Sequence, residues 1–346
     1  MFKVKPVAPE RLSALLERMP KAELHMHIEG SLEPELMFAL AARNGLSLPY
    51  ADVAALRRAY VFNNLQEFLD VYHQGTQVLK TEQDFYDMTW AYLQRAAADQ
   101  VLHTEIFFDT QTHTGHGLSS DVVINGLHRA CVDAQAQWGI SASLILCFLR
   151  HLSEAEAFEA LEQVMPQRDK LVGIGLASSE LGHPPEKFAK VFAKARSQGF
   201  RLVAHAGEEA PPAYIWSALD VLKVERIDHG VQALKDAALV ARLVQDRIPL
   251  TVCPLSNLKL RVFPSLADHN LGQMLNAGLV ATVNSDDPAY FGGYINDNFT
   301  QTFAALGLTA QHAYQLAFNS FEASFVDTSA KRAMQHRLTE VFETFE

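Results

Sequence analysis

The stretch KAELHMHIEG, residues 21–30, opens the pattern that decides the fold of this chain. Residues 22–28 form a short apolar run that leads into a glycine, which favours a β-strand. Side chains alternate between the two faces of a strand, so His25 and His27 are expected on the same side. Such a pair fits half of a metal site or two polar side chains on a solvated sheet face. The pair alone leaves both interpretations open, and further ligands along the chain have to decide between them.

Seven further β-rich runs follow along the chain. They cover residues 101–109, 140–149, 171–177, 200–207, 226–231, 248–254 and 279–285. Amphipathic stretches lie between most of them, such as SEAEAFEALEQVM at 153–165. Strands that alternate with helices pair in parallel through right-handed crossovers, and eight such units predict an α/β fold, a (β/α)8 TIM barrel. An open doubly wound sheet is the main alternative, but no Gly-x-Gly-x-x-Gly motif follows an early strand.

One connection, residues 31–100, is too long for a simple crossover and carries several helical patterns. An insertion after the first strand lies at the C-terminal mouth of a barrel, where it can form a helical lid over a pocket. The sequence shows no internal repeat, low-complexity tract or linker that would divide it. Residues 1–346 are therefore predicted to form a single barrel domain.

Composition limits the classes of function. Hydrophobic residues make up 49% of the chain and charged residues 20%, which allows a large core. The net charge of −11 argues against nucleic-acid binding. Three widely separated cysteines suggest reduced thiols. No apolar core of a signal peptide is apparent, and the longest apolar run (144–149) is too short to span a bilayer. We expect a cytoplasmic protein that binds neither membrane nor nucleic acid, with its oligomeric state left open.

Polar residues that bind metals or move protons follow four of the predicted strands. They are His25 and His27 on the first, His205 and Glu208 on the fifth, His229 on the sixth, and Asp286 and Asp287 after the eighth. The C-terminal ends of the strands form the catalytic face of a TIM barrel. The sequence therefore predicts that residues far apart in the chain meet at one site.

Three histidines and one carboxylate suit Zn²⁺, which takes imidazole nitrogen and carboxylate oxygen. A catalytic site keeps one position open for water and lowers the pKa of that water from about 15.7 to roughly 7. Glu208, three residues after His205, is placed to act as an acid that does not bind the metal. Each residue also has an ordinary interpretation: His205 as a core histidine, and Asp286 and Asp287 as part of a helix start.

Two other features are expected to be structural. His113 and His116 lie in the stretch TQTHTGHG (110–117), for which a solvated loop is the preferred interpretation. Cys253 in VCPLSN has the setting of a buried thiol.

Five ordered motifs, PKAELHMHIEG, HAGEE, RIDHG, CPLSN and NSDDP, resemble those of the adenosine/adenine deaminases of the amidohydrolase superfamily. The resemblance runs from about residue 19 to the helices past Asp287. The chain is more similar to the adenine branch than to the adenosine branch, which typically has Gly-Asp-Glu where this sequence has Ser178, Ser179 and Glu180.

The resemblance implies an activity and a role for each residue of the site. The implied reaction is zinc-dependent hydrolytic deamination of adenine to hypoxanthine and ammonia, a step of purine salvage, with one Zn²⁺ per subunit and a small purine base as the binding partner. The implied metal ligands are His25, His27, His205 and Asp286, and Asp286 also accepts the proton of the water. Glu208 is implied to donate a proton to purine N1, and His229 to orient the water. Asp287 is implied to form a hydrogen bond with purine N7, and Ser178 and Glu180 to contact the edge of the base.

Four alternatives stay open. Ala177 stands where the adenine enzymes usually carry aspartate, so an N6-substituted adenine such as isopentenyladenine is one alternative substrate. Adenosine is another. A related amidohydrolase with two metals bridged by a modified lysine is disfavoured because no lysine ends the fourth strand. A catalytically silent zinc-binding module is disfavoured by the presence of Glu208, His229 and Asp287 beside the ligands.

Overall fold

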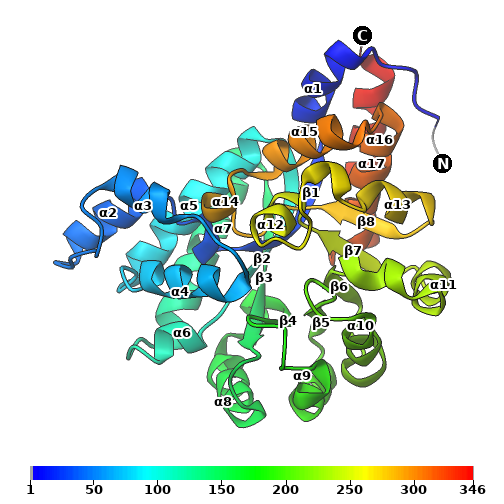
Figure 1. Ribbon diagram of the computed structural model, residues 1–346. Helices are drawn as coiled ribbons and strands as arrows, with labels where there is room; N and C mark the ends of the chain where they lie inside the picture. Colours follow the sequence, from blue (N-terminus) through cyan, green and yellow to red (C-terminus); the bar gives the residue numbers. More distant parts are fainter. Residues whose placement is uncertain (1–2, 346) are drawn as a thin grey trace.

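A computed structural model describes residues 3–345 of the chain. Its centre is one eight-stranded parallel sheet in which the strands follow one another in chain order (Figure 1). The strands are β1 (Lys21–His27), β2 (Val101–Phe108), β3 (Ser141–Leu149), β4 (Leu171–Ala177), β5 (Arg201–Ala206), β6 (Arg226–His229), β7 (Pro249–Val252) and β8 (Val280–Val283). All eight predicted strands are confirmed, with ends that move by no more than two residues.

The sheet closes on itself where the residues after β8 meet β1. Met26 forms a parallel bridge with Asp286. The backbone N–H of His27 donates to the carbonyl of Asp286 at 2.8 Å, and the N–H of Asp286 donates to the carbonyl of His25 at 3.1 Å. The predicted TIM barrel is therefore confirmed, and its closure brings the first and last predicted site residues together.

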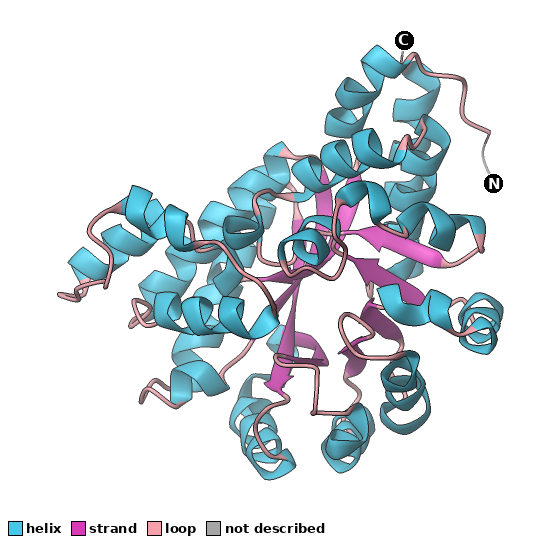
Figure 2. Cartoon of the chain, viewed as in Figure 1, coloured by secondary structure: helices cyan, strands magenta, loops and turns pink. Residues whose placement is uncertain are grey.

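Helices surround the strands on the outside of the barrel (Figure 2). They are α1 (Pro9–Arg18), α2 (Pro34–Arg43), α3 (Val53–Ala59), α4 (Leu65–Thr76), α5 (Glu82–Ala98), α6 (Gln111–Thr114), α7 (Ser120–Trp138), α8 (Glu154–Val164), α9 (Ala189–Ser197), α10 (Pro212–Ser217), α11 (Ala237–Gln245), α12 (Pro254–Lys259), α13 (Leu271–Asn276), α14 (Pro288–Phe291), α15 (Ile295–Leu306), α16 (Ala310–Ala323) and α17 (Thr328–Thr344). Within residues 3–345, every helix is too short or too polar to cross a membrane.

Local sequence explains where several of these helices begin and end. Ser153 and Glu156 form a reciprocal capping box at the start of α8, which satisfies two backbone N–H groups of its first turn. Helix α7 ends at Gly139, whose φ of 73° is left-handed and favours glycine. These signals fix the lengths of the crossovers and thereby the places at which the next strands start.

The barrel wall separates two apolar layers. Leu24 and Met26 of β1 belong to the large cluster between the strands and the helices. Phe107, Ile145 and Val203 belong to a separate, small buried cluster. The ring of Phe107 lies 5.1 Å from that of His25, so the small cluster fills the inside of the barrel beside the histidine. The alternation in ELHMH therefore sends its histidines inward and its apolar residues outward.

The long connection between β1 and β2 contains α2, α3, α4 and α5. Helices α2 to α4 extend to one side of the barrel in Figure 1. The sequence patterns predict α2, α4 and α5 but not α3, a seven-residue helix. Of the predicted domain 1–346, residues 1, 2 and 346 lie outside the described part, and the role of the insertion as a lid stays a prediction.

Candidate active site

A cavity opens at the C-terminal ends of the strands, the face predicted to be catalytic. Seven of the predicted site residues line it: His27, Ser178, His205, Glu208, His229, Asp286 and Asp287. Helix α4 supplies its apolar roof through Leu65, Phe68 and Leu69, and Phe291 of α14 adds another ring. The cavity is therefore polar on the barrel side and apolar on the side of the insertion, which suits a flat, partly polar ligand.

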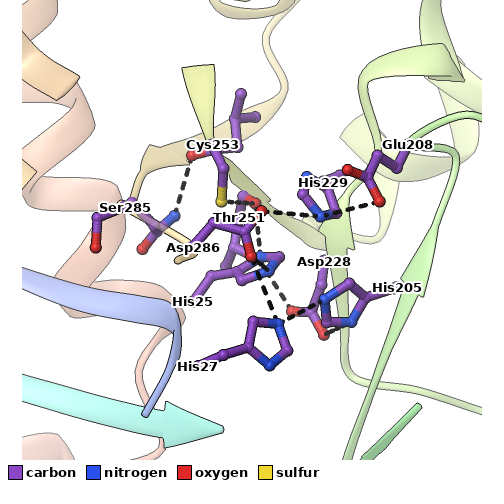
Figure 3. A network of polar contacts seen from close by, with 12 residues as sticks. His25, His27, His205, Glu208, Asp228, His229, Thr251, Cys253, Ser285 and Asp286 are labelled. Carbon is purple, nitrogen blue, oxygen red and sulfur yellow. Dashed lines mark hydrogen bonds and ion pairs between the residues drawn. The ribbon is translucent and has the colours of Figure 1, made fainter. Parts of the chain in front are cut away.

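Four histidines and one aspartate meet at the floor of this cavity (Figure 3). His25 Nε2 lies 3.2 Å from Asp286 Oδ1, and His27 Nε2 lies 3.5 Å from the same oxygen. The Nε2 atoms of His27 and His205 are 3.1 Å apart. His229 Nε2 faces the other oxygen, Oδ2 of Asp286, at 3.7 Å. The convergence predicted from four separate strand ends is therefore present in the structure.

Two overlapping groups of side chains are close enough to share a cation. Ligand atoms of His25, His205, His229 and Asp286 lie within 4.8 Å of one another, and His27 forms a second such group with Asp286 and Asp287. These groups contain all four predicted ligands and add His229 as a further candidate. Their neighbours decide which ring nitrogens are free to bind.

Hydrogen bonds behind His25 leave one of its nitrogens available. His25 Nδ1 lies 2.9 Å from the hydroxyl oxygen and 3.1 Å from the carbonyl oxygen of Thr251. The Thr251 hydroxyl donates to Asp228 Oδ1 at 3.0 Å, so it accepts from His25 Nδ1–H. Nε2 is therefore the nitrogen that His25 presents to the cluster, 3.2 Å from Asp286 Oδ1, and the one available to a metal. Such support from behind the ring is the usual setting of a metal-binding histidine.

A different chain of hydrogen bonds makes His229 a donor. The backbone N–H of Leu271 donates to His269 Nδ1 at 3.1 Å, so the His269 proton is on Nε2. That proton faces Asn257 Oδ1 at 3.2 Å, and the Asn257 amide nitrogen then donates to His229 Nδ1 at 3.4 Å. His229 therefore keeps its proton on Nε2, directed into the cavity, and is better placed to donate a hydrogen bond than to bind a metal.

Three of the four histidines are neutral in this environment. Burial also disfavours the charged form of His25, but Asp286, with smaller contributions from Asp228 and Thr251, raises the pKa of His25 above its usual value. Burial, with the charge of Asp286 opposing it, lowers the pKa of His27 to about 4. Burial and the neighbouring His25 lower the pKa of His205 well below its usual value, and the same causes lower that of His229 to about 3. Metals bind neutral imidazole, so the residues present fit a borderline-soft cation such as zinc.

The carboxyl groups around the cavity have opposite protonation states. Burial, followed by the charges of Asp286 and Glu180, raises the pKa of Glu208 well above its usual value. Burial and the charge of Asp286 do the same to Asp287. Burial also disfavours ionisation of Asp286, but the neighbouring histidines, His25 foremost, together outweigh it and hold the Asp286 pKa well below its usual value. Neighbouring acids that differ in this way are typical of acid–base catalysis.

The backbone is strained at this site. Ser178, His229 and Asp286 have φ values of 80°, 66° and 63°, in the left-handed region that residues other than glycine rarely adopt. Each lies just after, or at the end of, a barrel strand, so a sharp turn directs its side chain toward the mouth. Strain that the surrounding fold maintains is common at functional sites.

One part of the site was missed in the sequence. His113 is only 2% exposed and its Nε2 lies 3.1 Å from Glu29 Oε1, so the expectation of a solvated loop is wrong for His113. Asp109 lines the cavity beside this pair, and burial together with the charge of Glu29 raises its pKa to about 6. The pairing depends on the approach of the β1 and β2 loops, which sequence spacing does not reveal. His116 is exposed, as expected.

The remaining predicted positions differ in their surroundings. Ala177 lines the cavity, and the Ser178 hydroxyl lies 2.8 Å from His151 Nδ1. Glu180 is not among the described residues that line the cavity, because its carboxylate accepts hydrogen bonds from the backbone after β5. Cys253 is fully buried, which confirms the prediction for this thiol.

Comparisons with known proteins agree with this site. The family model described as Adenosine deaminase matches residues 20–341. A protein named Adenine deaminase from Albidiferax ferrireducens is 77% identical over 343 residues, which cover 99% of each chain. Another of that name, from Trichlorobacter lovleyi, is 62% identical over 335 residues and 96% of each chain.

Solved structures show the same fold. The crystal structure of adenine deaminase from Arthrobacter aurescens superposes with a TM-score of 0.93 at 50% identity, over 94% of this chain and 100% of that one. An amidohydrolase from Burkholderia ambifaria with bound Zn superposes with a TM-score of 0.88 at 28% identity, over 98% and 94% of the two chains. The resemblance seen in the motifs is confirmed, and the chain belongs to the adenosine deaminase family.

Proposed function

We propose that this protein is a metal-dependent hydrolase that converts adenine and water into hypoxanthine and ammonia. The observation that carries the proposal is the convergence of four histidines, Asp286 and Glu208 at one cavity. Relatives that share 77% and 62% of their residues with this chain are named adenine deaminase, which supports adenine as the substrate.

The metal is proposed to be zinc, held by His25, His27, His205 and Asp286. The donor set suits this ion, and a relative in the same superfamily carries bound Zn. When bound, zinc supplies a hydroxide nucleophile near neutral pH by lowering the pKa of water from about 15.7 to about 7.

Glu208 and Asp287 are proposed to hold the purine ring. Burial and the neighbouring charges raise the pKa values of both acids and so favour their protonated forms, which can donate hydrogen bonds to ring nitrogens. Glu208 donates to N1, which makes C6 electrophilic, and Asp287 donates to N7 on the other side of C6. Ser178, at the cavity wall, offers a hydroxyl to the base edge.

The proton balance of the reaction follows from these states. Water attacks C6 as Asp286 accepts one of its protons and the Glu208 proton passes to N1. His229 donates its Nε2–H to the oxygen that develops negative charge. The C6–N6 bond then breaks, the amine leaves as ammonia with the proton held by Asp286, and the remaining hydroxyl proton returns to Glu208. The product is hypoxanthine, and both acids recover their starting states.

A substituted amine at N6 is the second candidate substrate, because Ala177 and Cys147 leave a small apolar wall inside the cavity. Zinc-loaded protein should be assayed by ultraviolet absorbance with adenine, adenosine and isopentenyladenine. We expect the largest kcat/KM for adenine. A preference for adenosine overturns the assignment to the free base, and a preference for isopentenyladenine favours the substituted substrate.

Glu208→Gln is the matched test of the acid, since it keeps the size and one hydrogen-bonding oxygen of the side chain. We expect bound zinc to be retained and kcat to fall by roughly 10²–10⁴-fold, the usual contribution of general acid catalysis. Retention of the full rate would refute the role of Glu208. A role in purine salvage and a cytoplasmic location stay predictions of the same proposal.

A further inference from the structure

The carboxylate of Glu180 lies against the backbone of the loop that carries Glu208. Its Oε1 accepts a hydrogen bond from the N–H of Gly207 at 2.6 Å. Its Oε2 accepts from the N–H groups of Glu208 at 3.2 Å, Glu209 at 2.8 Å and Ala210 at 2.9 Å. Glu180 is only 1% exposed, so these four bonds form away from water.

Four consecutive N–H groups around one anion make a strong local constraint. Hydrogen bonds to a carboxylate are among the stronger ones in proteins, and a buried N–H without a partner is costly. The loop can turn this tightly because Gly207 has a φ of 71°, and a Cβ there would lie 2.4 Å from the Ile215 side chain. The backbone of residues 207–210 is therefore shaped around the Glu180 carboxylate.

A buried arginine fixes the start of the same loop. Arg150 follows β3, and its Nη1 donates to the carbonyl of His205 at 2.7 Å. Its Nε donates to the carbonyl of His183 at 2.9 Å. Arg150 is fully buried. The ends of β3 and β4 thus hold the segment that carries both a candidate metal ligand and the candidate acid.

We propose that Glu180 is a positioning residue that fixes Glu208 through the backbone of residues 207–210, without contacting the purine. This inference rests on the proposed function for the role of Glu208 as proton donor. It also replaces the expectation that Glu180 reads the base edge, because all four observed contacts of its carboxylate in this loop are with backbone N–H groups.

The variant Glu180→Gln tests this proposal in a double-mutant cycle with Glu208→Gln. The glutamine amide places an NH2 group against backbone donors and loosens the loop. We expect Glu180→Gln to lower kcat by roughly 100-fold, the cost of misplacing a catalytic group by about 1 Å, with KM and hypoxanthine binding changed less than about threefold. In the Glu208→Gln background the same change should have no further effect on the residual rate.

Two outcomes of the cycle overturn the proposal. If Glu180→Gln weakens hypoxanthine binding about tenfold in both backgrounds, Glu180 contacts the purine directly. If Glu180→Gln lowers the rate by the same factor in the Glu208→Gln background as in the wild type, its effect does not pass through Glu208. Glu162→Gln on the exposed face of α8 is the matched control and should change neither rate.

Hydrogen exchange provides a readout that does not depend on turnover. We expect the amides of residues 207–210 to exchange at least about tenfold faster in Glu180→Gln, with the β1 amides and zinc content unchanged. Unchanged exchange at 207–210 overturns the proposal. If the wild-type protein deaminates no 6-aminopurine, the proposed function fails while this exchange measurement still tests the constraint on the loop.

Discussion

Replacement of Glu105 by glutamine should destabilise the protein at neutral pH and should remove part of its pH dependence. Glu105 and Arg226 form an ion pair at 2.5 Å inside the barrel, and both side chains are fully buried. Arg226 also donates to the carbonyl of Leu24, the residue before His25, at 3.1 Å. The variant keeps the shape of the side chain but removes the nearer carboxylate partner of Arg226 and leaves only Asp228, whose Oδ1 lies 3.7 Å from Arg226 Nε.

The magnitude follows from the pKa of the pair. Burial favours the neutral form of Glu105. The Arg226 charge, together with His103 and the backbone N–H of Phe325, outweighs burial and lowers the pKa of Glu105 from 4.5 to about 2. A shift of that size corresponds to roughly 3 kcal/mol, which agrees with the 3–5 kcal/mol typical of breaking a buried pair. We therefore expect Glu105→Gln to lower the free energy of unfolding by about 3 kcal/mol at neutral pH.

The sign of the pH effect is fixed by the lowered pKa in the folded state. The stabilisation is complete above the unfolded pKa and is lost as pH falls toward the folded pKa. Between about pH 5.5 and pH 3.5, the difference between wild type and variant should shrink by about 1.3 kcal/mol. Urea unfolding at several pH values measures this difference directly.

Two results would refute the reasoning. One is a cost of less than about 1 kcal/mol at neutral pH, because removal of the nearer partner of a buried arginine is expected to cost more than that. The other is a difference between the two proteins that stays constant down to about pH 3.5, because protonation of Glu105 must then be uncoupled from folding. The double variant Glu105→Gln/Arg226→Met removes both charges and should be more stable than Glu105→Gln alone.

Three substitutions test the geometry of the site. Gly30→Ala should lower kcat/KM about 100-fold, because its Cβ would lie 2.0 Å from Asp287 Oδ1. The control Gly272→Ala should leave kcat/KM unchanged, because its Cβ would meet only an ordinary van der Waals contact at 3.6 Å. An unchanged kcat/KM in Gly30→Ala would show that the position of Asp287 does not matter for the reaction. Asn257→Asp should lower kcat about 100-fold while zinc stays bound, because an acceptor at that position moves the His229 proton to Nδ1. If zinc binding weakens as much as kcat falls, His229 is a metal ligand instead. Thr251→Val should weaken zinc binding at least about tenfold in competition with a chelating dye, and unchanged affinity would contradict the support of His25 by Thr251.

Most of the fold could be predicted because its signals are local. Each barrel strand is a short β-rich run, and each crossover helix has its own apolar period and cap, as at Ser153. Helix α3 was missed because seven residues are too few to show a helical period. The closure of the barrel at Met26 and Asp286 follows from the number of units and not from any local motif.

The site was predictable to the extent that it lies at strand ends. His25, His205 and Asp286 meet because parallel strands present their C-terminal ends at one face. Loop conformations decide the rest, and these depend on contacts between segments distant in sequence. The buried His113–Glu29 pair and the backbone contacts of Glu180 are of this second kind, so their positions required the structure.

Ammonia release from adenine, followed while metal-free protein is titrated with Zn²⁺, tests whether one metal site with Glu208 as its acid performs the reaction. We expect the rate to rise linearly and to level at about one equivalent, as a mononuclear site requires. Glu208→Gln should bind the same amount of zinc and release ammonia roughly 10²–10⁴-fold more slowly. A rate that levels only at about two equivalents, or full activity in the metal-free protein, would contradict the proposed site.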